Sequence, residues 1–477
     1  MGWIALVGLL AAVAVVGMIL MVGKFDGIER ALYWLTSFGA GGDVDSYCQL
    51  RAPIDEHTFV TENNSLLTLY RVVGSRRHIG EEEFDQQTHA LYQVLNNALK
   101  AGNKGEQHSV IFGFRSNPRG GEDLLKSILG PSLMTAKRLR ASVEFLFEDK
   151  LAAMAPACVE EVAVFGIMTH TAGLSPSERA RWDEQRAKQF QAIGKAGVSI
   201  DPTMTQSPLG PPAVLVSRHQ AVLQTVEGKI CDPGSPVKVM MDRLTCHEAA
   251  SMMRGFLDAS VSQPSWRPRL LGDRPAGTTA QRSTGTVESA LPPRIGRQLV
   301  TEPLREKHGD AEMVRRGKYW YASVTLDAAP SEDLSPSFSS LAQALGSRIP
   351  WQVNIEVLPK GLEYNQMERL FAAFFGAAGD HNKAIKRAFD SLKEMQTQGV
   401  YVAAMRAVFT TWATTEAECV DNVSVLKSTV EGWGQAVASN ETGAPGAAFL
   451  ASCPGFPRRI PAAVVPAPLD ALARMLP

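Results

Sequence analysis

The feature that most constrains this chain is an uninterrupted apolar run at residues 3–22, WIALVGLLAAVAVVGMILMV, which contains no charged residue. A helix rises ~1.5 Å per residue, so a run of this length spans the ~30 Å hydrocarbon core of a bilayer. The sequence therefore predicts a transmembrane anchor over residues 1–23, with Trp3, Leu10, Val15 and Leu20 inside the bilayer.

Two other interpretations of this run are a cleaved signal peptide and a buried helix of a soluble domain. No Lys or Arg precedes the run and no A-x-A-like site ends it, which disfavours a signal peptide. The run is apolar on every face, which disfavours a soluble helix. Lys24 and Arg30 follow it, so the positive-inside rule predicts a single-pass inner-membrane protein whose body lies on the cytoplasmic face.

The remainder of the chain is long enough for more than one domain. We expect an α+β fold of two lobes behind the transmembrane helix, because strand-like and helix-like patterns alternate along it. The expected segments are an interfacial helix and linker (24–42), a first lobe (43–210), a connecting helix–strand–helix (211–262), a Pro/Arg/Gly-rich linker (263–315), a second lobe (316–443) and a Pro-rich tail (444–477).

Both lobes show the same order of elements: strand, helix, strand, long helix, strand, helix. In the first lobe the expected elements are a strand pair at 58–73, a helix at 80–100, a strand at 108–115, helix over 122–154, a strand at 160–169 and a helix at 175–193. In the second lobe they are 318–326, 338–345, 351–358, 365–398, 400–409 and 415–438. Sequence identity between the lobes is not apparent, so the element order alone suggests a duplication.

Composition and cysteine usage exclude some classes of function. The 48 basic and 49 acidic residues give a net charge of -1, so the chain as a whole has no electrostatic footprint for nucleic acid. The six cysteines are scattered and form no C-x-x-C pair. They are expected to be reduced thiols, consistent with a cytoplasmic body.

Searches for catalytic motifs give a negative result. No G-x-x-x-x-G-K-[ST], H-E-x-x-H or G-x-S-x-G sequence occurs. Gly130 to Lys137 (GPSLMTAK) lacks the second glycine of a phosphate loop, and His247, beside Cys246 and Glu248, has no second histidine one turn away. We therefore predict no catalytic, cofactor-binding or metal-binding residue.

Two weaker features remain. Residues 115–121 (RSNPRGG) and 266–269 (WRPR) are local basic segments, which we expect to be solvated loops. A thiol-dependent enzyme using Cys158 or Cys246 is an alternative function. His170 is a conceivable base for Cys158, but the intervening strand would separate the two by ~35 Å at ~3.3 Å per residue.

Several short motifs, in this order, resemble the N-terminal half of the IcmB/DotO (TraU-like) conjugal-transfer ATPases of Dot/Icm-type (type IVB) secretion systems. They are Tyr33–Ser37 (YWLTS), Ser46–Leu50 (SYCQL), Thr135–Leu139 (TAKRL), Glu160–Val162 (EEV), Trp266–Pro268 (WRP) with Gly272-Asp273, Ala467–Leu469 (APL) and Arg474–Pro477 (RMLP). The resemblance covers residues 33 to 477.

The resemblance implies a docking region that holds a secretion or conjugation ATPase at the inner membrane, next to other channel components, and that self-associates. ATP and Mg²⁺ would bind a following motor domain, because no position here matches a Walker residue and the chain ends where that domain would begin. The hydrophobic anchor is a departure from the family. Alternatives are the membrane-anchored thiol-dependent enzyme and a stand-alone membrane scaffold.

Overall fold

The structure is a computed structural model that describes the chain from residue 46 to residue 474 with internal gaps. The described ranges are 46–75, 80–100, 108–195, 205–207, 209–231, 239–260, 266–273, 291–308, 312–330, 337–346, 348–359, 402–441 and 443–474. The expected anchor, the interfacial helix and the expected helix at 365–398 lie outside them.

The described strands belong to one large sheet. They are β1 (Leu50–Pro53), β2 (Thr58–Thr61), β3 (Leu66–Ser75), β4 (His108–Asn117), β5 (Glu160–Thr169), β6 (Val239–Arg243), β7 (Arg305–Lys307), β8 (Met313–Arg316), β9 (Tyr319–Ala328), β10 (Trp351–Val357), β11 (Val402–Ala413), β12 (Val437–Asn440) and β13 (Val465–Pro468). The main path through the sheet is β1-β2-β3-β5-β4-β10-β11-β9-β8-β7. Every pairing between these strands is antiparallel.

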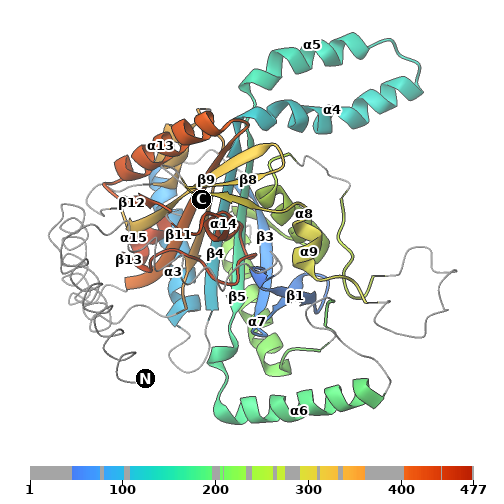
Figure 1. The fold of residues 1–477 in the computed structure, drawn as a ribbon, viewed down its shortest axis with the longest axis vertical. Coiled ribbons are helices and arrows are strands. Elements are labelled where there is room, and N and C mark those ends of the chain that lie inside the picture. The colour runs from blue at the N-terminus through green and yellow to red at the C-terminus, as the bar shows by residue number, and fades with distance from the viewer. Residues whose placement is uncertain are drawn as a thin grey trace, which may run out of the picture.

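The helices cover the sheet or project from it (Figure 1). They are α3 (Glu81–Lys100), α4 (Gly121–Arg138), α5 (Glu144–Met154), α6 (Pro176–Lys195), α7 (Ala213–Val226), α8 (Cys246–Leu257), α9 (Ile295–Leu299), α10 (Phe338–Leu345), α13 (Glu416–Gly432), α14 (Pro445–Ala451) and α15 (Leu469–Arg474).

The sheet contains the same strand order twice. The first half reads β6-β3-β5-β4 and the second reads β12-β9-β11-β10, each preceded by a strand pair, β1–β2 and β7–β8. Within each half the connections run strand, helix, strand, excursion, strand, helix, strand, which gives the 4-1-3-2 order of a ferredoxin-like unit. The halves join edge to edge where β4 pairs with β10, from Trp351 opposite Ser116 to Val357 opposite Val110.

Alternating side chains build two cores, one on each face of the sheet. On β4, Phe112 and Phe114 belong to the core under α3, α7, α10 and α13, whereas Ile111 belongs to the core under α8, α9 and α14. A strand buried on both faces has a nearly continuous apolar sequence. This explains the EEVAVFGIMT sequence of β5.

The expected fold class, an α+β arrangement of two lobes behind a transmembrane helix, is wrong. The two halves share one 13-stranded antiparallel sheet, because the edge strands β4 and β10 pair with each other instead of ending separate lobes. Across the described part of the chain, no helix combines the length and apolarity needed to cross a membrane.

Several local expectations are confirmed. The turn between β2 and β3 contains Asn64 in the left-handed region (φ 59°), and β5 and α10 have the predicted bounds. The Pro-rich tail contains regular elements, since α14, β13 and α15 follow residue 444 and β13 pairs with β11. The expected helix at 415–438 ends at Gly432, and β12 follows it.

Candidate docking surface

Helices α4 and α5 form a hairpin that projects from the body, at the top of Figure 1. It is inserted between β4 and β5, which are neighbours in the sheet. The base of α4 is held close to the chain before β5: a Cβ on Gly121 would come 2.1 Å from the Cys158 carbonyl oxygen, so only glycine fits there. The hairpin therefore has a fixed root.

The two helices face each other through half-buried side chains, Leu129 and Leu133 on α4 and Phe147 and Leu151 on α5. Each pair is spaced four residues apart, as neighbours on one helix face are. On α4 only Gly121 and Leu125 are buried, and α5 has no buried residue. The hairpin consequently lacks a core of its own beyond this single seam.

The hairpin exposes large apolar side chains along its length, and we call these side chains together the hairpin surface. Of the eleven large hydrophobic side chains exposed in the described part of the chain, seven lie between residues 121 and 154. They are Leu124 (36%), Ile128 (60%), Met134 (57%), Leu139 (75%), Phe145 (58%), Leu146 (54%) and Met154 (41%). Single exposed apolar residues need no explanation, but a cluster of them marks an interaction site.

Charges on the hairpin are separated along its length. The base carries Glu122 and Asp123 in the first turn of α4, and the tip carries Lys137, Arg138 and the exposed Arg140. This arrangement suits the helix dipole, which favours acidic side chains at the N-terminus and basic ones at the C-terminus. Part of this charge is compensated within the hairpin, because Lys126 pairs with Glu122 and Lys137 pairs with Glu144.

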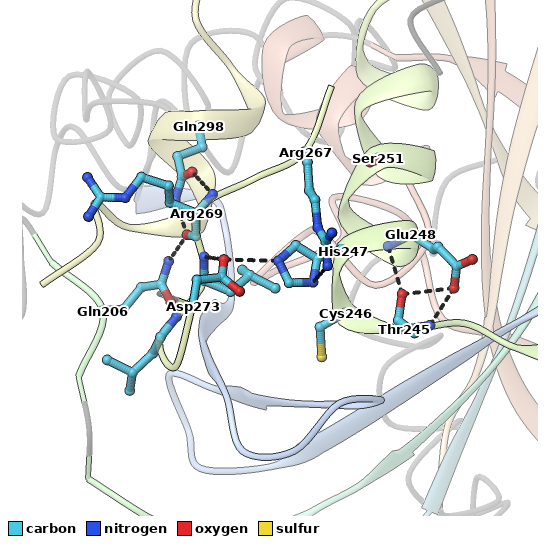
Figure 2. A network of polar contacts seen from close by, with 12 residues as sticks. Gln206, Thr245, Cys246, His247, Glu248, Ser251, Arg267, Arg269, Asp273 and Gln298 are labelled. Atoms are coloured by element: carbon cyan, nitrogen blue, oxygen red, sulfur yellow. Dashed lines mark hydrogen bonds and ion pairs between the residues drawn. The ribbon is translucent and has the colours of Figure 1, made fainter. Parts of the chain in front are cut away.

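The basic segment at 266–269 leaves Arg267 and Arg269 exposed, as expected, and Arg267 lies beside His247 of helix α8 (Figure 2). Asp273 Oδ2 lies 3.0 Å from His247 Nε2, and it accepts a 2.8 Å hydrogen bond from Leu270 N. Partial burial raises the pKa of Asp273, but these two hydrogen bonds and the nearby charges of His247 and Arg267 outweigh it and lower the pKa overall. Arg267 Nη2 lies 3.3 Å from His247 Nδ1. Because a guanidinium only donates, Nδ1 is the acceptor of this contact and Nε2 is the donor to Asp273.

Neighbouring residues complete this network without providing a nucleophile. Thr245 and Glu248 form a capping box at the start of α8, and Ser251 Oγ donates to the Trp266 carbonyl at 2.9 Å. Gln206 and Gln298 bond the backbone of Arg269 from either side. The network fixes the loop on α8, and every polar side chain named here has a structural partner.

The other basic segment, 115–121, differs at Arg115 from the solvated loop that was expected. Arg115 belongs to β4 and is buried, with its guanidinium 5.3 Å from the Trp412 ring and 3.7 Å from Glu160 Oε2. Arg119 is exposed and pairs with Glu418. The GPSLMTAK segment lies inside α4, as expected of a helical sequence.

The cysteines do not form a reactive site in the described part of the chain. Cys246 is buried, its Sγ donates to the Asp55 carbonyl at 3.6 Å, and burial raises its pKa. Burial likewise raises the pKa of Cys419 to about 12 and raises the pKa of Cys453 well above its ordinary value. Cys158 precedes β5 and His170 follows it, at opposite ends of the strand. Nucleophilic thiol chemistry needs a thiolate, and burial disfavours the thiolate at Cys246, Cys419 and Cys453.

A buried histidine network, which sequence reasoning missed, lies between α7 and the sheet. His219 on α7 contacts Thr169 Oγ1 (2.8 Å) and Thr68 Oγ1 (2.9 Å), and His108 Nδ1 lies 2.9 Å from the same Thr169 oxygen. Burial, followed by the charge of His108, lowers the pKa of His219 to about 3 and that of His170 to about 4. The network holds α7 on the sheet through neutral imidazoles.

The described residues contain no group of three or more His, Cys, Asp or Glu side chains that could hold a metal ion. Comparison with known proteins finds no family model and no curated protein that matches the chain. The expected anchor residues lie outside the described ranges: Trp3, Leu10, Val15, Leu20, Lys24 and Arg30. Within the described chain, the hairpin surface is therefore the feature that suggests a binding partner.

Proposed function

We propose that this chain is a non-catalytic docking and assembly region, and that the hairpin surface is its main contact site. The observation that carries the proposal is the concentration of exposed apolar side chains on a rooted hairpin that has no core of its own. Leaving such side chains in water forgoes ~25 cal/mol for each Å² of apolar surface that a partner would cover. A partner is the ordinary reason for such a surface.

Two further observations support a docking role over a thiol-dependent enzyme. In the described chain the buried cysteines have raised pKa values, and the His247–Asp273 pair faces Arg267 instead of a nucleophile. A second projecting helix, α6, exposes Phe190 (48%) and stacks Arg186 near Trp182. Helices that project from a large rigid sheet can contact other proteins, as the role of a scaffold requires.

Within this role we propose the more specific setting that the motif order suggests: the docking region of a conjugal-transfer ATPase of a type IVB secretion system. The body would sit at the cytoplasmic face of the inner membrane, held there by residues 3–22, next to other channel components. The support is the order of short motifs and the apolar run in the sequence. A stand-alone membrane scaffold is the alternative within the same class.

The test is affinity copurification of the full chain from cells that produce the secretion-channel proteins. The triple variant Ile128→Ser, Met134→Ser, Phe145→Ser should lose those proteins, because it removes the apolar contact without touching the core. Val214→Ser on α7 is the matched control, with an exposed apolar side chain (41%) outside the projecting helices. Unchanged recovery with the triple variant contradicts the docking surface, and ATP hydrolysis by the purified chain at motor rates contradicts the non-catalytic role.

A further inference from the structure

The two basic segments of the sequence both reach the last turns of helix α8. Arg115, from the first segment, lies on β4, and its Nη1 is 3.7 Å from the position of a Cβ on Gly255. Trp266, from the second segment, has its ring centroid 4.4 Å from the guanidinium of Arg254. We infer that Arg115 and Arg254 bind the phosphate group of a small molecule beside Gly255. This site uses no residue of the hairpin surface, so the inference goes beyond the docking role.

Both guanidiniums have N–H donors that the described part of the chain does not use. Arg115 is 5% exposed and Arg254 is half-buried, and the Nε atoms of both are buried without a hydrogen-bond partner among the described residues. Glu160 Oε2 lies 3.7 Å from Arg115 Nη1, which is too far for a hydrogen bond. Because a buried donor without a partner is costly, these donors favour a ligand that accepts from them.

Aromatic rings hold both guanidiniums in an orientation that suits an oxyanion. The Arg115 guanidinium lies over the Trp412 ring, 5.3 Å from its centroid, and that of Arg254 lies over the Trp266 ring. A guanidinium over a ring is fixed through its face, while its N–H groups lie in its own plane and stay available at the edge. Two such N–H groups match two oxygens of a phosphate.

The charges around α8 select a small anion. Arg316 pairs with Asp258 at 3.3 Å, and Glu160 faces Arg115, so these two carboxylates leave one of the three guanidinium charges uncompensated. Burial lowers the pKa of Arg254, Asp258 opposes this effect and the charge of Arg316 adds to it, which shows that Arg254 lies near that ion pair. A polyanion would be repelled by the two carboxylates, whereas a single phosphate group balances the remaining charge.

Gly255 leaves room for the ligand. Apart from the backbone of α8 and the neighbours of Gly255 in the chain, Arg115 Nη1 is the one described atom within 4 Å of a Cβ placed there. The position next to the Arg115 donors is therefore open on the side of α8 that carries Gly255.

The experiment is calorimetric titration of sodium phosphate into the full chain in detergent, at constant ionic strength. Arg254→Gln should weaken phosphate binding at least ~10-fold, because it removes a charge-assisted fork. Arg254→Lys keeps the charge but not the fork, so its affinity should fall between the two. Arg269→Gln is the matched control, with an exposed guanidinium on the same segment as Trp266, and should stay within ~2-fold of wild type.

A change of opposite sign separates binding from a structural role of these arginines. Glu160→Gln removes the carboxylate that competes for Arg115 and should strengthen phosphate binding by ~3-fold or more. A structural role alone predicts no change in phosphate affinity for this variant. A single unfolding transition near the wild-type denaturant midpoint checks that each variant folds.

Three outcomes would overturn the inference. The first is that the wild-type chain binds no phosphate at concentrations up to about 10 mM. The second is equal affinity in wild type and Arg254→Gln, which would place the phosphate elsewhere. The third is that sodium acetate binds as tightly as phosphate, which would show that the site accepts any small anion. The apolar triple variant of the hairpin should bind phosphate as wild type does, so failure of the docking role and failure of this site are distinguishable.

Discussion

The buried His219 and the half-buried His170 should make the fold sensitive to mild acid. His219 is fully buried between Thr68 and Thr169, and His170 lies 2.5 Å from Ser109 Oγ. In the unfolded chain both rings have an ordinary pKa of about 6.5, but in the folded chain their pKa values fall to about 3 and about 4. Below pH 6.5 the unfolded state therefore binds more protons than the folded state, and stability decreases as the pH falls.

The magnitude follows from the two pKa values. At pH 5 the unfolded imidazole is almost fully protonated and the folded one is almost fully neutral, a difference of about 1.5 pK units for each ring, or about 2 kcal/mol at 1.36 kcal/mol per unit. Together the two rings should remove about 4 kcal/mol from the free energy of unfolding between pH 8 and pH 5. That is a large share of the ~5–15 kcal/mol typical of a folded domain.

Urea denaturation of the detergent-solubilised chain, followed by tryptophan fluorescence at pH 8, 6.5 and 5, measures this loss. His219→Gln and His170→Gln keep a polar side chain that cannot titrate, so each should reduce the pH dependence by about 2 kcal/mol. His89→Gln, at an exposed position on α3, is the control and should leave it unchanged. Equal stability of the wild type at pH 8 and pH 5, or an unaltered pH dependence in both buried variants, would refute the reasoning.

Three further predictions address the caps, the tail and the thiols. Thr245→Ala removes the capping box of α8 and should lower the free energy of unfolding, measured with denaturant, by about 1 kcal/mol. Thr135→Ala on the exposed face of α4 should lower it by less. Equal losses for the two variants would argue against the cap. Phe449→Ala should lower the free energy of unfolding by about 3–5 kcal/mol, because this buried ring lies 4.3 Å from the Tyr321 ring. If the tail were dispensable for folding, this variant would lose almost no stability. In the native chain a maleimide should leave Cys453 unlabelled until the protein unfolds, since that thiol is buried, and rapid labelling would contradict its burial.

Sequence patterns predicted the local elements better than their assembly. The continuous apolar run of β5 is a local signal, and the structure has this strand where expected. Strand β12 was missed because it is only four residues long and follows α13 closely. The position of Arg115 was missed for a different reason: its burial depends on Trp412, which lies far away in the sequence and stacks against it.

The hairpin surface could be found only in part from the sequence. Its helical character was predicted over 122–154, and the structure has α4 and α5 there. Exposure is a different matter, because periodicity shows which face of a helix is apolar but not whether another element covers that face. The structure answers this by leaving Ile128 and Phe145 uncovered.

The joined sheet leads to a last prediction, which separates one folding unit from two lobes. Trp351 begins β10 at the seam with β4, has no exposed surface, and packs 5.2 Å from Phe114 of the first half and 5.9 Å from Phe338 of the second. Trp351→Ala leaves a cavity shared by both halves and should cost about 3–5 kcal/mol. Because the strand pairing is continuous across the seam, hydrogen exchange should accelerate in β5 of the first half as well as in β11 of the second.

Phe190→Ala on exposed α6 is the control for this experiment and should change stability by less than about 0.5 kcal/mol. Two independent lobes would give a different result. They would unfold in two transitions, and Trp351→Ala would shift only the transition of the later half of the chain. A single transition that moves as a whole is what an edge-to-edge sheet requires, because neither β4 nor β10 can lose its partner without exposing an unpaired strand edge and the core beneath it.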